Sequence, residues 1–296
     1  MKKFEIITDS CSELDLLLRQ KYDIDYIPMH MSLDGKEYPA SLDWEDFPVK
    51  TFYQLLRDGK RFLTAQITKE EYVQKFEPLV KDGLGVLYVA CSSGLSASIK
   101  ASLLAKEELT AKYPNAEIHC IDSLMAGSGL GSLCISASKM REQGIELSEI
   151  AKWVEEKKWE VNQECTVEKL TYLKQAGRVS AAAAFFGGLL SIKPIIISDA
   201  KGHNFALEKV KGRKNSLDRV AERFVERYRD VPYQDVCISH ADCEEDAFEL
   251  KRMIEEKMGK PLDARFSYIG PIVGGASGPG TVAIYFYGQE VTVNKD

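Results

Sequence analysis

Short apolar segments that end in hydroxyl or carboxylate residues alternate with helical patterns through the first half of the chain. The segments FEIITDS (residues 4–10), LGVLYVACSS (84–93) and AEIHCIDS (116–123) are rich in β-forming residues, and IDYIPMHMSL (24–33) is expected as a further strand. Such alternation favours a mostly parallel sheet with flanking helices. Ligands of such sheets bind at the carboxyl ends of the strands, so this half of the chain predicts a polar binding edge.

The segment VACSSGLSASIKAS (residues 89–102) carries five serines where a strand is expected to end and a helix to begin. Hydroxyl groups and free backbone amides at a helix start favour an anion. The stretch GLSAS (94–98) also nearly matches the nucleophile elbow of a serine hydrolase acting on a small ester, although the final glycine is missing. His240 and Asp242 are the candidate base and acid, but two residues so close together do not favour a triad built from separate loops. A serine-rich helix start without any reaction is the third interpretation, and the residues alone leave all three open.

The second half of the chain has a different distribution of apolar and charged residues. A very apolar stretch from Ala181 to Leu190 lies between Arg178 and Lys193, and charged helical segments and the strand DVCISH (235–240) follow. We therefore expect two α/β domains with a ligand site near their interface. The expected N-terminal domain, residues 1–160, has a mostly parallel sheet, and the expected C-terminal domain, residues 161–296, has a mixed or antiparallel sheet.

Charge and cysteine usage limit the partners and the compartment. The formal net charge of −6 argues against a nucleic-acid-binding protein, which needs a basic face. No segment approaches the ~20 apolar residues of a membrane span, so no stable membrane insertion is expected. Seven cysteines without a CxxC pair fit a reducing compartment. We expect a cytoplasmic protein.

Two further motifs bear on metal and dinucleotide binding. Cys237, His240 and Cys243 are residue types that bind zinc, but a fourth ligand is missing and Cys237 belongs to an apolar strand. The glycines of GSGLG (127–131) are too closely spaced for a dinucleotide fingerprint, and we interpret them as positions where a helix packs closely against its neighbours. We expect no metal, no cofactor and no catalytic residue, which favours a binding protein.

Seven stretches, distributed over nearly the whole chain, carry a family resemblance: IITDSCSEL, LTAQIT, CSSGLSASIKAS, IDSLMAGSGLG, LTYLKQAGRVSAAAAFFGGLLSIKPI, EKVKGRKN and IGPIVGGASGPGTVAIYF. With these stretches the chain resembles the DegV family of bacterial fatty-acid-binding proteins. The resemblance implies a two-domain α/β protein that buries a long acyl chain and has no catalytic activity of its own. It also implies an acyl carrier role in phospholipid metabolism, in which a separate ATP-dependent fatty-acid kinase receives the acid and forms acyl phosphate.

The resemblance further implies which residues contact the ligand. Thr64 and Ser93 match the positions expected to hydrogen-bond the carboxylate. The other expected carboxylate contacts are Ser92, Ser96, Ser10, Ser123 and Ser277. The expected lining of an acyl tunnel, which a plain hydrophobic core explains almost as well, is Phe185, Phe186, Leu189, Leu190 and Ile192.

Arg178 and Arg213 are expected to recognise a partner or a phosphate, with solvated loop charge as the alternative. Two positions depart from the family pattern. Ala276 stands where the family commonly has a histidine in the last glycine loop, and Ala97 stands where it commonly has glycine. These changes imply an altered head-group geometry, a different ligand, or loss of the transfer to a kinase.

Overall fold

The computed structural model describes residues 3–180 and 191–294, and the chain forms three sheets. The first half of the chain builds a four-stranded sheet in the order β2-β1-β6-β7, in which every neighbouring pair is parallel. We call it the parallel sheet. Its strands are β1 (Phe4–Asp9), β2 (Ile24–Ile27), β6 (Gly85–Ala90) and β7 (Ile118–Asp122).

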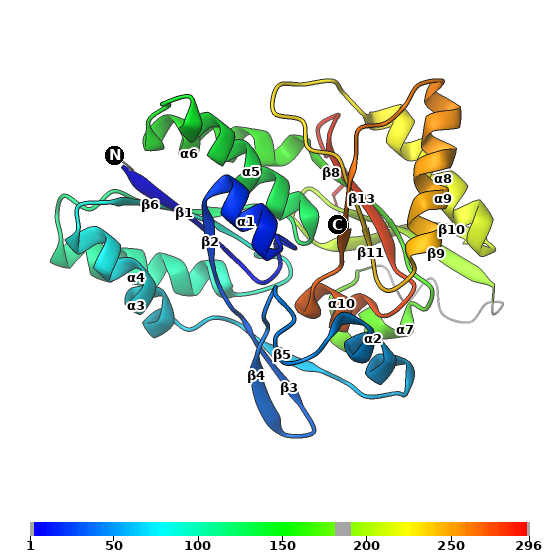
Figure 1. The fold of residues 1–296 in the computed structure, drawn as a ribbon, viewed down its shortest axis with the longest axis horizontal. Helices are drawn as coiled ribbons and strands as arrows, with labels where there is room; N and C mark the ends of the chain where they lie inside the picture. The colour runs from blue at the N-terminus through cyan, green and yellow to red at the C-terminus, as the bar shows by residue number, and fades with distance from the viewer. Residues whose placement is uncertain (1–2, 181–190, 295–296) are drawn as a thin grey trace.

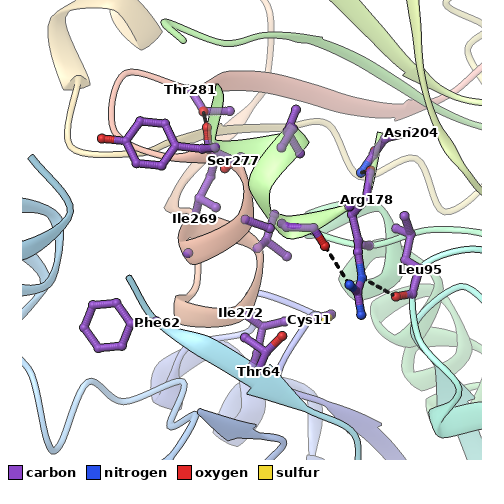
Figure 2. Close-up of a pocket in the computed structure, with 18 of the residues that line it drawn as sticks. Cys11, Phe62, Thr64, Leu95, Arg178, Asn204, Ile269, Ile272, Ser277 and Thr281 are labelled. Atoms are coloured by element: carbon purple, nitrogen blue, oxygen red, sulfur yellow. Dashed lines mark hydrogen bonds between the residues drawn. The ribbon is translucent and has the colours of Figure 1, made fainter. Parts of the chain in front are cut away.

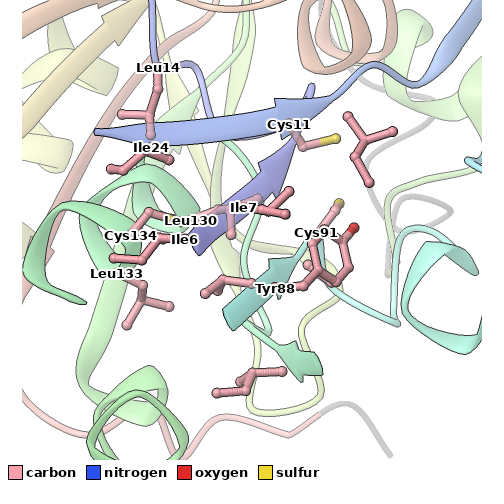
Figure 3. Packing of buried hydrophobic residues seen from close by; sticks show 14 of the residues in the cluster. Ile6, Ile7, Cys11, Leu14, Ile24, Tyr88, Cys91, Leu130, Leu133 and Cys134 are labelled. Carbon is pink, nitrogen blue, oxygen red and sulfur yellow. The ribbon is translucent and has the colours of Figure 1, made fainter. Parts of the chain in front are cut away.

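Helices cover both faces of the parallel sheet, as the alternating pattern predicts. The helices α3 and α4 pack on each other and on β6 and β7, whereas α5 and α6 pack on each other and on the opposite side of the sheet (Figure 1). Figure 3 shows Leu130 and Leu133 of α5 packed near Ile6 and Ile7 of β1 in this core. The helices around the parallel sheet are α1 (Leu16–Tyr22), α3 (Lys69–Lys81), α4 (Ser98–Lys112), α5 (Ser128–Glu142) and α6 (Leu147–Lys157).

The segment 24–33 forms two strands in different sheets, so the prediction of one continuous strand is wrong. β2 ends at Ile27, and β3 (His30–Leu33) joins a small antiparallel sheet with β4 (Lys36–Pro39) and β5 (Leu63–Ala65). Pro28 stands at the break, where its missing amide hydrogen cannot contribute to a strand ladder.

The second half of the chain builds a six-stranded sheet in the order β10-β9-β8-β13-β11-β12, antiparallel except for the β11–β12 pair. One face packs against α8 (Arg213–Arg227) and α9 (Glu244–Met258) (Figure 1). This arrangement confirms the predicted fold class. The strands are β8 (Val161–Thr166), β9 (Ile192–Ser198), β10 (Asn204–Lys211), β11 (Cys237–His240), β12 (Arg265–Tyr268) and β13 (Val282–Tyr287).

Short helices lie near the small sheet: α2 (Val49–Arg57), α7 (Thr171–Ala176) and α10 (Pro271–Ser277). A 3-10 turn, η1 (Lys158–Glu160), directly follows α6. The helix α5 contacts strands of both large sheets. Close approach at its first turns requires glycine, because a Cβ on Gly131 would lie 2.5 Å from the backbone oxygen of Ser12. The interpretation of the GSGLG glycines as close-packing positions is therefore confirmed. The predicted domain boundary near residue 160 lies between α6 and β8, and the division into two domains stays a prediction.

Glu13, in the loop before α1, joins the two large sheets. Its side chain is 3% exposed, and its Oε2 accepts hydrogen bonds from the hydroxyls of Ser128 on α5 (2.8 Å) and Ser239 on β11 (2.9 Å). Burial raises the pKa of Glu13 from its ordinary value of 4.5 to about 7, against the opposing effects of these hydroxyls and of Arg265. The carboxyl group is therefore protonated in the folded protein at a pH where the unfolded chain has released the proton.

This pKa predicts a pH dependence of stability. Between pH 4.5 and pH 7 the folded state binds more protons at Glu13 than the unfolded state, so the free energy of unfolding falls as the pH rises through this window. We expect this group to contribute a loss of about 3 kcal/mol. Glu13→Gln should flatten the dependence, measured by chemical denaturation below and above the window. The same pH dependence in wild type and variant would contradict the assignment to Glu13.

Candidate functional site

A cavity of about 770 Å³ lies where the two large sheets meet the small sheet. We call it the central cavity. The loops after β1 and β6, strand β5, helices α7 and α10, and one face of the six-stranded sheet form its wall. Its volume is in the range of about 300–1,000 Å³ that small-molecule sites occupy. Figure 2 shows several of these side chains converging from separate elements.

The six-stranded sheet supplies a buried, largely apolar floor. Register places Cys165 of β8 beside Ile196 of β9 and Ala283 of β13, and all three side chains line the central cavity. The alternate residues Val282 and Ile284 point to the other face and pack with α8 and α9. This alternation is the two-residue period of a strand that separates two packed layers.

Asp9, at the end of β1, positions the loops after β1 and β6, which form part of the cavity wall. Its carboxylate accepts the backbone amides of Cys11 (2.9 Å) and Cys91 (2.8 Å) and the hydroxyl of Tyr88 (3.0 Å). Burial raises the pKa of Asp9, while these donors act in the opposite direction. One carboxyl group thus fixes the two loops whose cysteine side chains line the cavity.

Four of the predicted carboxylate contacts line the central cavity: Thr64 on β5, Ser93 and Ser96 after β6, and Ser277 at the end of α10. Thr64 and Ser93 are exposed, and their hydroxyls make no hydrogen bond to any residue that the structure describes. The Ser96 hydroxyl lies 3.0 Å from that of Ser98. The Ser277 hydroxyl is buried and also has no partner within the described residues. Three of these four hydroxyls therefore have no hydrogen-bond partner among the described residues and can bind a ligand.

The other three predicted serines do not line the cavity, and each of their hydroxyls is hydrogen-bonded to a backbone group. The Ser10 hydroxyl donates to the backbone oxygen of Ala40 (2.7 Å) and accepts from the amide of Met29 (2.8 Å). The Ser92 hydroxyl donates to the backbone oxygen of Gly202 (2.8 Å). The Ser123 hydroxyl donates to the backbone oxygen of Met125 (3.0 Å). Their polarity marks the ends of strands, but the sequence does not say which way a side chain points at such a position.

The predicted acyl tunnel residues Phe185, Phe186, Leu189 and Leu190 lie outside the described residues. Ile192 begins β9 and does not line the central cavity. The floor residues Cys165, Ile196, Ala283 and Tyr285 were not predicted. The sequence signal was weak, since continuous apolar runs such as VAIYFY do not show which alternate side chains face a ligand.

Several cationic side chains belong to the exposed part of the cavity lining, which we call the mouth of the central cavity. Arg178 lines it and is held by hydrogen bonds to the oxygens of Leu95 (3.2 Å) and Ala176 (2.6 Å) (Figure 2). Lys60, Arg61 and Lys169 also line it, whereas no aspartate or glutamate does so within the described part of the chain. In a protein of net charge −6 this distribution favours an anionic ligand.

Arg213 has a different environment. Its guanidinium pairs with Asp246 (2.9 Å) and donates to the oxygen of Gly280 (2.7 Å), away from the cavity lining. The structure therefore does not bring together the two arginines that were predicted to recognise a partner. Arg213 instead connects α8 to α9 and to the loop before β13.

The hydrolase and zinc alternatives find little support in the geometry. The Ser96 hydroxyl contacts another serine, and within the described residues no histidine ring is hydrogen-bonded to a serine. The described residues contain no cluster of three or more potential metal ligands, so Cys237, His240 and Cys243 do not form one. In the same part of the chain, no helix has the length and apolar character needed to cross a membrane.

Comparison with known proteins places this geometry in a family context. A model of the DegV family, whose description is that of an uncharacterised protein, matches residues 3–289. The DegV domain-containing protein CPE0026 of Clostridium perfringens is 41% identical over 292 residues, which are 98% of this chain and 99% of that protein. YteA of Lactococcus lactis, also a DegV domain-containing protein, is 28% identical over 95% of this chain and 96% of its own length.

Solved structures share the whole fold. A DegV lipid-binding protein from Thermotoga maritima superimposes with a TM-score of 0.84 at 24% identity, covering 99% of this chain and all of that one. The fatty-acid-binding DegV family protein SAG1342 from Streptococcus agalactiae gives 0.84 at 23% identity, with 98% of this chain and all of that one covered. These likenesses confirm the α/β fold class.

Proposed function

The chain belongs to the DegV family, and on this premise we propose that it binds a long-chain fatty acid in the central cavity. The observation that carries the proposal is the combination of a buried apolar floor with a cationic mouth that has no lining carboxylate among the described residues. Such a site suits a molecule with an apolar chain and an anionic head group. The names of the proteins from T. maritima and S. agalactiae, which describe lipid and fatty-acid binding, support the same choice.

Chain burial dominates the affinity. A chain of about 16 carbons gains on the order of 10 kcal/mol when its methylene groups leave water at about 0.8 kcal/mol each. A hydrogen bond to the charged carboxylate adds about 1.5–3 kcal/mol. The floor of Cys165, Ile196 and Ala283 therefore supplies affinity, and the polar groups at the mouth orient the chain.

The carboxylate binds at the mouth, where Thr64 and Ser93 offer hydroxyls that have no partner within the described residues, and Arg178 supplies positive charge. A carboxylate without donors would be costly to desolvate or would take up a proton. Ser277 is a further donor that lines the cavity with its hydroxyl unpartnered among the described residues. Since Ala276 replaces the histidine common in the family, hydroxyls and a guanidinium carry out the head-group binding here.

The protein acts as an acyl carrier that presents the bound acid to an ATP-dependent fatty-acid kinase, which forms acyl phosphate for phospholipid metabolism. The exposed position of Thr64 and Ser93 supports this role, because a carboxylate at the mouth remains within reach of a second protein. Arg178 and its cationic neighbours at the mouth are the candidate contacts for that partner.

Mass spectrometry of lipid extracted from the purified, folded protein tests the function directly. Near-stoichiometric fatty acid supports the carrier, and its length describes the cavity. An empty protein that also takes up no added fatty acid would refute the proposal.

A double substitution tests the head-group site. We expect Thr64→Val with Ser93→Ala to weaken fatty-acid binding by roughly a hundredfold, because two hydrogen bonds to a charged group are lost. Unfolding temperature should change little, since both side chains are exposed. Ser123→Ala is the matched control: it removes a strand-end hydroxyl that does not line the cavity. Unchanged affinity in the double variant would remove Thr64 and Ser93 from the site.

A further inference from the structure

In the part of the chain that the structure describes, the largely apolar floor of the central cavity contains a polar pair. Gln163 of β8 and Tyr285 of β13 are direct cross-strand neighbours, and both line the cavity. Gln163 is 6% exposed and Tyr285 is 2% exposed. Side chains at directly opposite positions of an antiparallel pair lie close together on the same face. A glutamine and a tyrosine therefore face the ligand space from within the buried sheet.

The hydrogen-bonding capacity of this pair is only partly used. The Gln163 side-chain nitrogen donates to the Oδ1 of Asn204 (3.2 Å), but its Oε1 accepts no hydrogen bond from a described residue. The Tyr285 hydroxyl lies over Gly127, where a Cβ would be only 2.2 Å from the hydroxyl oxygen. It likewise makes no hydrogen bond within residues 3–180 and 191–294.

The other fully buried tyrosines of the chain contrast with Tyr285. The hydroxyl of Tyr53 donates to a backbone oxygen (2.5 Å), those of Tyr72 and Tyr88 bind each other (2.6 Å), and that of Tyr287 binds a serine hydroxyl (3.0 Å). Buried phenols normally find such partners. Burial also raises the pKa of Tyr285 well above its ordinary value, so its hydroxyl is a neutral donor.

We propose that the fatty acid bound by this protein carries a hydroxyl group along its chain, which hydrogen-bonds to Tyr285 and Gln163. The inference rests on the proposed function, because it concerns the substrate class of the same cavity. A chain hydroxyl can accept from the phenol and donate to Gln163 Oε1, whereas an unsubstituted chain leaves both buried groups unpaired. A site built around such groups discriminates against the analogue that lacks the hydroxyl.

Binding of stearic acid and of a series of positional isomers of hydroxystearic acid to the delipidated protein tests this inference. We expect one isomer, or two adjacent ones, to bind about tenfold more tightly than stearic acid, a difference of about 1.4 kcal/mol. Tyr285→Phe and Gln163→Leu should each remove most of this preference, measured within each variant as the ratio of the affinities for the preferred isomer and for stearic acid. Tyr287→Phe is the matched control, because its phenol lies two residues along the same strand but does not line the cavity.

The outcomes separate this inference from the proposed function. Equal affinity across the whole series in the wild type, with stearic acid still bound, means that water satisfies the pair, and it overturns the inference alone. A preference that persists in both Tyr285→Phe and Gln163→Leu also overturns it. Failure of every acid to bind overturns the proposed function and this inference together. Because the isomer series uses the wild type, the test stands even where a variant fails to fold.

Discussion

Replacing Ala283 by phenylalanine should shorten the longest fatty acid that the protein binds and weaken binding of long chains by about a hundredfold. Ala283 lies on the floor of the central cavity beside Cys165 and Ile196, so a larger side chain there extends into the ligand space. Displacing about four methylene groups costs about 3 kcal/mol at about 0.8 kcal/mol each. A chain-length series measured by fluorescence displacement should show the loss for long acids and little loss for short ones.

Two controls keep this prediction specific. Ala283→Val should have an intermediate effect, because it adds less volume at the same position. Ile284→Leu alters the neighbouring residue, whose side chain packs on the opposite face with α8 and α9, and it should leave ligand binding unchanged. Equal affinity of Ala283→Phe and wild type for every chain length would mean that the acyl chain does not cross this floor.

Arg223→Met should destabilise the fold by about 3–5 kcal/mol, because the buried carboxylate of Glu164 loses both of its hydrogen bonds to this arginine and keeps only the more distant Arg227, at 3.9 Å. Glu164 on β8 is 1% exposed and accepts two hydrogen bonds from the Arg223 guanidinium, at 2.5 and 3.0 Å. Burial raises the pKa of Glu164, and Arg223 opposes that effect. The loss should therefore become smaller in acid, where the unpaired carboxyl group can take up a proton.

Denaturant unfolding of matched variants separates this buried pair from ordinary surface charge. Arg219→Met removes an arginine of the same helix that pairs with Glu208, Glu222 and Glu226, and it should cost less than Arg223→Met, because these carboxylates remain in contact with water. The double variant Arg223→Met with Glu164→Leu should recover most of the lost stability, since the buried carboxylate is removed together with the arginine that binds it. Equal losses in Arg223→Met and Arg219→Met would show that Glu164 is adequately solvated or paired without Arg223.

The pattern of apolar runs with polar ends predicted the strands of the parallel sheet correctly, because this pattern depends on local structure. The strands that end at Asp9, Ala90 and Asp122 form one parallel sheet, as their apolar runs and polar ends indicate. Prediction was wrong over residues 24–33, where an apolar run continues across Pro28 while the chain passes from one sheet to another. The hydrophobic periodicity of a segment indicates whether it forms a helix or a strand, but it does not indicate which other strand it pairs with.

The same limit applies to the candidate site, where the sequence indicates a polar region but does not distinguish the side chains that line the cavity from those that do not. Serines at the ends of strands were recognisable as a group, yet Ser93 lines the cavity while its neighbour Ser92 binds the oxygen of Gly202, more than a hundred residues away. Only the docking of the turn between β9 and β10 on this loop decides between them. The sequence thus predicted a polar region and several residues that line the cavity, and the structure separates these from the serines whose hydroxyls bind backbone groups.

The alternating α/β organisation, the polar edge of the parallel sheet and membership of the DegV family can all be recognised in the amino-acid sequence. The floor of the cavity cannot, because Gln163, Ile196 and Tyr285 come together from three separate strands of the folded chain. Strand register is the cause of this difference. Successive side chains point to opposite faces of a sheet, so a shift of one residue would exchange the cavity lining for the layer that packs on α8 and α9.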